Sequence, residues 1–251
     1  MSDRYDTRYD QPQRLYPDVA GRDVAGRDAA GFDAGLRKHM LSVYNYMTSG
    51  VLLTGIVALL FAQSGMAQQI MFGPGIMKWV IMLSPLAFIL VLSFGINRLS
   101  TGAMQALYWA FAVVMGLSMS TIFLIYTGGS IAMTFFATAA AFASLSLYGY
   151  TTKRDLSGMG TFLLMGVVGL IVASLLNLFM QSSALMYAIS AIGVLIFAGL
   201  TVYDTQRIKS IYFQVAGTDF IGKAAIMGAL SLYLDFINMF QFLLQFMGSR
   251  E

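Results

Sequence analysis

The stretch that decides the fold is GTFLLMGVVGLIVASLLNLFM, residues 160–180, an apolar run of 21 residues without a charge. An α-helix needs about 20 such residues to cross the hydrocarbon core of a bilayer. The rest of the 251-residue chain agrees, because 58% of it is hydrophobic and only 11% is charged, with no acidic residue between Asp33 and Asp155. Soluble domains carry roughly 25% charged residues. The composition therefore excludes a soluble globule.

Six further apolar segments have the same character. The seven predicted spans are residues 47–65, 79–96, 102–126, 130–150, 160–180, 184–203 and 224–247. The connections between them are short, so consecutive spans should run antiparallel. We therefore predict an all-α integral membrane protein with seven transmembrane helices.

The basic residues predict the orientation of the spans. Eight lie in flanks on one side, namely Arg37, Lys38, Arg98, Lys153, Arg154, Arg207, Lys209 and Lys223. The other side has only Lys78 and Arg250. Because cytoplasmic loops are enriched in Lys and Arg, the amino terminus is expected in the cytoplasm and the carboxyl terminus outside. Basic residues scattered among apolar segments fit this topology better than nucleic-acid binding.

The first 36 residues differ from the remainder in composition. They contain two RYD units and three related five-residue units, VAGRD, VAGRD and AAGFD, with few bulky apolar side chains. We expect a disordered, low-complexity cytoplasmic tail over residues 1–36 and a transmembrane domain over 37–250. Within that domain, residues 36–46 are expected to form a short interfacial helix. The chain has no cysteine, which excludes disulfides, thiolate metal sites and cysteine nucleophiles.

Asp235 is the ionisable residue that the spans place deepest in the bilayer. It lies 12 residues after Lys223, about 18 Å along a helix. A carboxylate at that depth must be neutral, paired or in contact with a wet cavity. Polar and small residues share an arc of about 140° on the same helix: Gly228, Ser231, Asp235, Asn238, Gln241 and Gln245. This pattern predicts an interior helix whose Ser231, Asn238 and Gln241 line a path.

A second acidic residue, Asp204, closes the sixth predicted span at its cytoplasmic end. Two carboxylates within about 4 Å repel by about 4 kcal/mol at an effective dielectric near 20. Such a pair would share a proton and titrate as a unit. Arg98, at the cytoplasmic end of the second span, is the natural cation to compete for the pair, although it also fits an ordinary positive-inside residue.

Three motifs carry a family resemblance: LYGYTTKRDLSG at 147–158, GLTVYDTQ at 199–206 and GALSLYLDFIN at 228–238. They resemble the transmembrane Bax inhibitor motif family, its bacterial branch most closely, over about residues 36–250. The resemblance implies a seven-helix fold with a central last helix surrounded by the other six, in a bacterial inner membrane. It also implies a pH-sensitive calcium leak in which an aspartate pair, here Asp204 and Asp235, is sensor and gate. The family's latching arginine maps to Arg98.

The expected function is thus a calcium leak channel and not an enzyme. The expected partners are the lipid bilayer and calcium, bound weakly and transiently by Asp204 and Asp235, and no cofactor is expected. One alternative is a non-catalytic membrane adaptor that modulates a membrane protease or a stress response through a protein partner. A proton-coupled exchanger is a second alternative. An intramembrane aspartyl protease is disfavoured, because Tyr233 stands where its second motif needs glycine.

Overall fold

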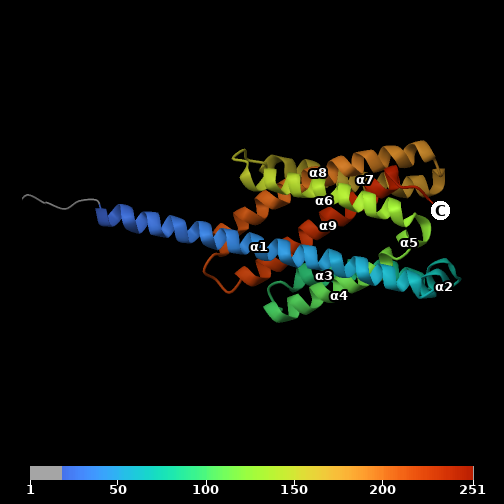
Figure 1. Ribbon diagram of the computed structural model, residues 1–251, viewed down its shortest axis with the longest axis horizontal. Helices are drawn as coiled ribbons and strands as arrows, with labels where there is room; N and C mark the ends of the chain where they lie inside the picture. Colours follow the sequence, from blue (N-terminus) through green and yellow to red (C-terminus); the bar gives the residue numbers. More distant parts are fainter. Residues whose placement is uncertain (1–18, 251) are drawn as a thin grey trace, which may run out of the picture. The chain divides into compact units, whose positions relative to one another are not determined.

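The structure is a computed structural model that describes residues 19–250, with side chains described from Ala34 onward. Its helices, in chain order, are α1 (Val19–Gln63), α2 (Met66–Phe72), α3 (Met77–Gly95), α4 (Thr101–Met119), α5 (Ile122–Ile125), α6 (Gly128–Thr151), α7 (Ser157–Met180), α8 (Ser183–Val215) and α9 (Ile221–Met247) (Figure 1). Seven spans in the described residues are long and apolar enough to cross a membrane, with α4 and α5 together forming one of them. The prediction of an all-α, seven-span membrane protein is confirmed.

The beginning of α1 differs from the expectation drawn from composition. The helix starts at Val19, so residues 19–36 are helical although a disordered tail was predicted there. Extending an existing helix is far easier than nucleating one, and the Ala and Arg of the repeats favour helix. Residues 1–18 lie outside the described part of the chain, and disorder there stays a prediction.

From Val19 onward, the structure contains no separate interfacial helix before the first span. Residues 36–46 are a continuous part of α1. The compact unit that carries the remaining helices starts at His39, within this segment. His39, Val43 and Met47 are all buried in this unit. Because they repeat every four residues, they form one face of α1, which packs into the bundle instead of lying on the membrane surface.

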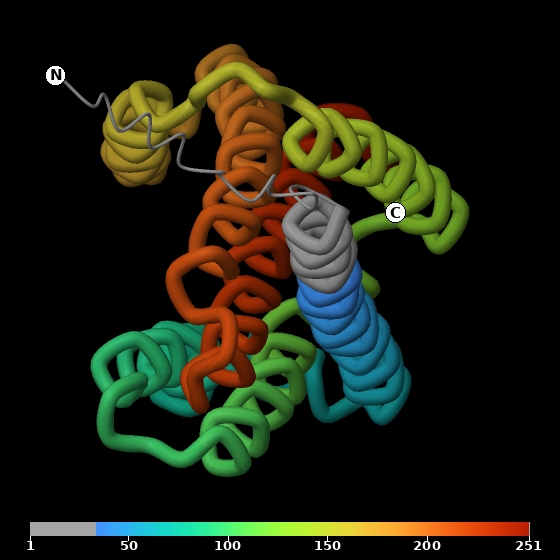
Figure 2. Tube along the Cα trace, turned by 90° about the vertical axis from the view of Figure 1, so that its left-hand side faces the viewer, coloured from blue at the N-terminus to red at the C-terminus, as the bar shows by residue number. Residues whose placement is uncertain are grey.

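The last helix occupies the middle of the compact unit. In the most apolar window of α9, 61% of the residues are buried, against 11% in α3 and in α7. Within this unit, Figure 2 shows α9 next to α8 and between α6 on one side and α3 and α4 on the other. The expected central last helix is therefore confirmed.

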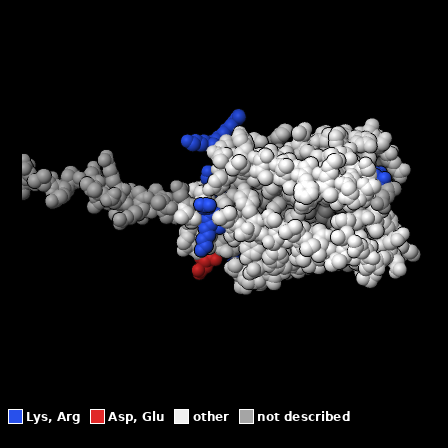
Figure 3. All heavy atoms as spheres, in the orientation of Figure 1, with Lys and Arg blue, Asp and Glu red and all other residues white. Residues whose placement is uncertain are grey.

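Two features distinguish the ends of the bundle. At one end, Ser249 accepts a hydrogen bond from the backbone N–H of Thr127, which ties the chain after α9 to the start of α6. The opposite end carries the α8–α9 connection with Asp219, and most of the visible Lys and Arg side chains gather there (Figure 3). This asymmetry matches the charge pattern from which the orientation was predicted.

Candidate functional site

The site is built on the antiparallel hairpin of α8 and α9. Three contacts define its register: Ser190 with Gln245, Gly193 with Phe242, and Ile208 with Gly228. In this register Asp204 is level with Ser231. Asp235 lies one helical turn further from the α8–α9 connection, about 5 Å along the axis. The two aspartates predicted from sequence are thus brought to neighbouring levels of one hairpin.

The hydropathy pattern predicted that Asp204 lies at the end of its helix, but the structure shows that it does not. Helix α8 continues to Val215, so about three further turns of helix follow Asp204 on the side of the α8–α9 connection. The apolar run ends before Gln206, Arg207 and Lys209. These residues are good helix formers, so the helix extends beyond the hydrophobic segment. The longer helix places Asp204 within the bundle, where it is half-buried.

The Asp235 carboxyl is enclosed at the centre of α9. The residue is 4% exposed. One of its oxygens, Oδ2, has no hydrogen-bond partner among the described residues. Asp204 is near enough to repel an ionised Asp235, whereas Arg207 is near enough to attract an ionised Asp204. A buried carboxyl without its full set of hydrogen bonds costs folding free energy, so such a group calls for an explanation beyond packing.

The basic residues near this end are arranged differently from the latch that the resemblance implied. Arg98 is exposed just after α3, and no ion pair within the described residues joins it to either aspartate. Instead, Lys223 Nζ donates to the carbonyl of Ile96 at 3.0 Å, and this bond ties the start of α9 to the end of α3. The latch role of Arg98 stays a prediction.

The three residues predicted to line a path point in different directions. Ser231 is half-buried and level with Asp204. Asn238 donates to the carbonyl of Leu234 and borders a cavity of about 350 Å³ that is otherwise lined mainly by apolar side chains of α7, α8 and α9. Gln241 is exposed on the surface of α9. They form no single lining surface in this structure.

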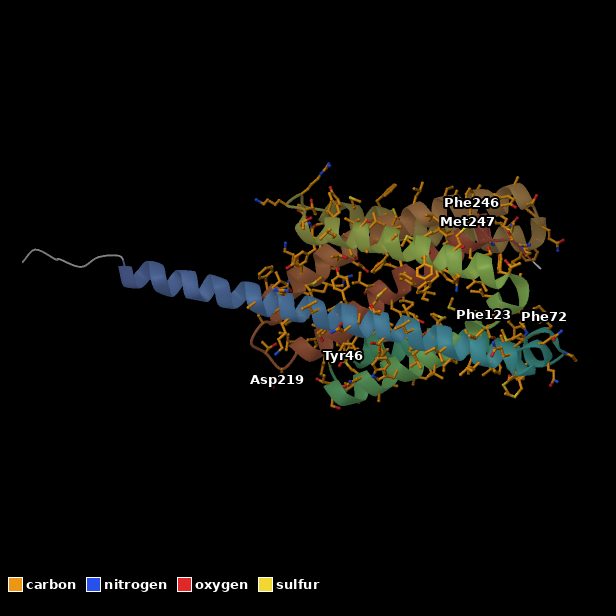
Figure 4. All side chains as sticks on the ribbon, viewed as in Figure 1. Tyr46, Phe72, Phe123, Asp219, Phe246 and Met247 are labelled. Carbon is orange, nitrogen blue, oxygen red and sulfur yellow. The ribbon has the colours of Figure 1, made fainter. Side chains whose placement is uncertain are left out.

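Sequence reasoning missed a buried hydroxyl contact of α9, two residues before Asp235. The Tyr233 hydroxyl and Thr54 Oγ1 lie 2.6 Å apart, and Thr54 donates to the carbonyl of Ala112. This contact joins α9 to α1 and α4. Nearby, the Tyr108 hydroxyl donates to the backbone carbonyl of Tyr46, a residue of α1 that Figure 4 labels. A tyrosine in an apolar span is not conspicuous in a sequence, and only its burial shows that its hydroxyl needs a partner.

The site has few groups that could hold a resident metal ion. Within the described residues, no three His, Cys, Asp or Glu side chains cluster closely enough to bind one. Calcium prefers six to eight oxygen ligands. Two aspartates supply fewer oxygen ligands than a resident calcium ion needs, so the pair suits a passing, partly hydrated cation better than a permanently bound one.

Comparison with known proteins gives consistent similarities. Residues 36–251 match the family described as "Inhibitor of apoptosis-promoting Bax1". The uncharacterized protein RP147 of Rickettsia prowazekii is 48% identical over 218 residues, which cover 86% of this chain and 92% of the relative. The inner membrane protein YbhL of Escherichia coli is 45% identical over 220 residues, covering 87% and 94%. The positions of Asp204 and Asp235 lie within the range that the family match covers.

Proposed function

Because this chain belongs to the Bax inhibitor family, we propose that it is a pH-sensitive calcium leak channel gated by Asp204 and Asp235. The observation that carries the proposal is the Asp235 carboxyl, buried at the middle of the central helix with an unpartnered oxygen and with Asp204 one turn away. Ionisable residues at membrane depth mark ion or proton pathways by default. In this role the protein is a transport protein and not an enzyme.

The chemistry of the pair supports both parts of the proposal. When ionised, the two carboxylates offer the hard oxygen ligands that calcium prefers. When one proton is shared, the net charge of the pair falls from −2 to −1, so the repulsion between the carboxyls is relieved and the site attracts a divalent cation less strongly. Loss of that proton would therefore couple pH to calcium entry. Two carboxylates supply too few ligands for tight binding, as a leak requires.

Arg98 and the location of the protein complete the proposal. Arg98 would act as a latch in a state in which the end of α3 approaches the pair, and the Lys223–Ile96 hydrogen bond already places that end beside α9. The name of YbhL suggests an inner membrane location. The amino terminus would lie in the cytoplasm, because the basic residues gather at the end with the α8–α9 connection.

The test is calcium entry into liposomes that contain the purified protein, measured from acid to alkaline pH. We expect a pH-dependent flux whose pH dependence is lost in Asp204→Asn and in Asp235→Asn. Asp219→Asn is the matched control, because Asp219 belongs to the same hairpin but is exposed in its connection. This variant should keep the normal profile.

Other outcomes would favour other functions. Flux with an unchanged pH profile in Asp235→Asn would contradict the sensor role. Flux that requires a proton gradient would indicate an exchanger. Absence of flux at every pH, from folded protein, would overturn the channel proposal in favour of the membrane adaptor.

A further inference from the structure

A row of buried side chains on α6 has no role in the function described so far. Its members are spaced by four residues: Ser130, Thr134, Thr138, Phe142 and Ser146. Four of the five carry hydroxyl groups. The two ends of the row contact neighbouring segments, because the Ser249 N–H donates to Ser130 Oγ at 2.9 Å and Thr205 Oγ1 of α8 donates to Ser146 Oγ at 3.3 Å. The row therefore faces the interior along the length of α6.

Polar groups of α8 and α9 line the opposite side. Thr201 and Thr205 are fully buried on α8 near the level of the aspartates. Further out, Ser190 Oγ donates to Gln245 Oε1 at 2.7 Å. We refer to these groups, with Ser130, Thr134, Thr138 and Ser146 of α6, as the hydroxyl seam. The seam extends from the level of Asp204 to the end of the bundle opposite the α8–α9 connection, which we call the outer end.

One polar atom of the seam and one of Asp235 are buried without a hydrogen-bond partner among the described residues. Thr134 is fully buried, yet its Oγ1 has no hydrogen-bond partner among the described residues, and the same holds for Asp235 Oδ2. A hydroxyl can usually satisfy itself by bonding the carbonyl four residues earlier, as Thr138 does with Thr134. An unpartnered hydroxyl in a helix interior is costly, and a transient water or cation would relieve that cost.

An apolar side chain, Phe142, interrupts the hydroxyl row of α6 and contacts Phe236, the residue after Asp235. The rings of Phe142 and Phe236 lie 5.5 Å apart between α6 and α9. Apolar constrictions of this kind close ion pathways by excluding water.

We propose that the cation path leads outward from Asp235 along the hydroxyl seam and is closed by the phenylalanine pair Phe142–Phe236. The permeant species is a partly hydrated divalent cation, for which hydroxyl oxygens replace some of the water ligands. This inference rests on the proposed channel function and locates its path. It differs from the path predicted from sequence, which ran along Ser231, Asn238 and Gln241.

Cysteine accessibility tests the path independently of calcium flux. The chain has no cysteine, so single substitutions give unambiguous labelling. We expect Thr134→Cys, in liposomes with a charged methanethiosulfonate on both faces, to react at the pH of maximal flux. The reaction should be at least about tenfold faster than for a cysteine in lipid, because only a hydrated thiol ionises. Added calcium should slow it.

Two further variants make the labelling decisive. Ser144→Cys is the matched control on α6, because Ser144 is exposed on the outer surface of the helix. Gln241→Cys reports on the rival path. Labelling of Gln241→Cys with no labelling of Thr134→Cys would overturn the seam and leave the channel function intact. Conversely, if Thr134→Cys reacts but the protein shows no calcium flux, the seam is hydrated as proposed. In that case only the proposed channel function is contradicted.

The proposed seal has its own test. Phe142→Ala should raise calcium flux at the pH where the normal protein is closed, whereas Phe136→Ala, in a side chain 70% exposed on the same helix, should not. Unchanged closed-state flux in folded Phe142→Ala would remove that phenylalanine from the seal.

Discussion

Helix α7 is the most apolar of the seven spans and α9 is the least apolar. In a soluble protein the more apolar helix would be the more buried one, but here it is the more exposed one. The buried share is 11% for α7 and 61% for α9. Lipid tails are as apolar as leucine, so apolar side chains gain nothing by leaving them for the protein interior. Polar groups do gain, because the interior offers hydrogen-bond partners. In a bilayer, the less apolar helix therefore becomes the core.

The side chains of the two helices show this difference directly. Phe162 and Phe179 of α7 are 74% and 87% exposed. On α9, by contrast, Tyr233 and Gln245 find hydroxyl partners on α1 and α8. Close packing and internal hydrogen bonds hold α9 in place, whereas α7 mainly presents a surface to lipid.

The largest expected effect comes from truncating a leucine in each helix. Leu232→Ala, at a fully buried position of α9, should destabilise the protein by about 2–5 kcal/mol because it leaves a cavity. Leu176→Ala on α7, where the side chain is 55% exposed, should cost well under half as much, since lipid fills the space. Unfolding in detergent micelles measures both. Equal losses would contradict the core and periphery assigned here.

A smaller effect is expected at two glycines. A Cβ added at Gly149 of α6 would lie 2.5 Å from the backbone carbonyl oxygen of Val202. Gly149→Ala should therefore cost about 1–3 kcal/mol. A Cβ at Gly169 of α7 meets nothing within 4 Å, so Gly169→Ala should be neutral or stabilise by up to about 1 kcal/mol through helix propensity. Thermal unfolding of the two variants side by side checks this, and loss of stability in Gly169→Ala would reveal an unseen contact of α7.

The smallest effect concerns the polar start of α7. Hydrogen bonds from the Ser157 hydroxyl and backbone N–H lower the pKa of exposed Asp155 below its ordinary value of 3.8. Because the folded-state pKa is the lower one, the stabilisation is complete above the ordinary pKa and is lost as the pH falls through the folded value. Ser157→Ala should remove part of this dependence in melting temperatures recorded between about pH 6 and pH 3. An identical pH profile in that variant would show that the hydroxyl contributes nothing.

Much of the fold could be predicted from composition. The importance of the Asp235 carboxyl could be predicted from its depth within the last span. The number of spans, the integral membrane class and the interior position of the last helix could be read from runs of apolar residues and from Asp235. The end of α8 could not, because the hydrophobic run stops at Tyr203 while the helix continues to Val215. Hydropathy reports where a helix leaves the membrane and not where it ends.

The candidate path shows a different limit. A polar arc on α9 was visible in the sequence, but neighbouring helices decide which part of that arc faces the interior, and Gln241 is exposed. The hydroxyl row of α6 also has a signal in the sequence, since its residues repeat every four positions. That signal is weak, because serine and threonine can satisfy their hydroxyls within their own helix.

By itself, the sequence determined a seven-span membrane protein with one carboxyl at the centre of its last helix, because crossing a bilayer requires apolar length and makes any buried charge conspicuous. Only the tertiary structure decided that Asp204 lies one turn from Asp235, that Tyr233 is bonded to Thr54, and that the hydroxyls of α6 face α8 and α9. Those relations depend on the register and rotation of packed helices. Packing sets both through close contacts at small residues such as Gly193 and Gly228, and no pattern within a single helix encodes the surface of its neighbour.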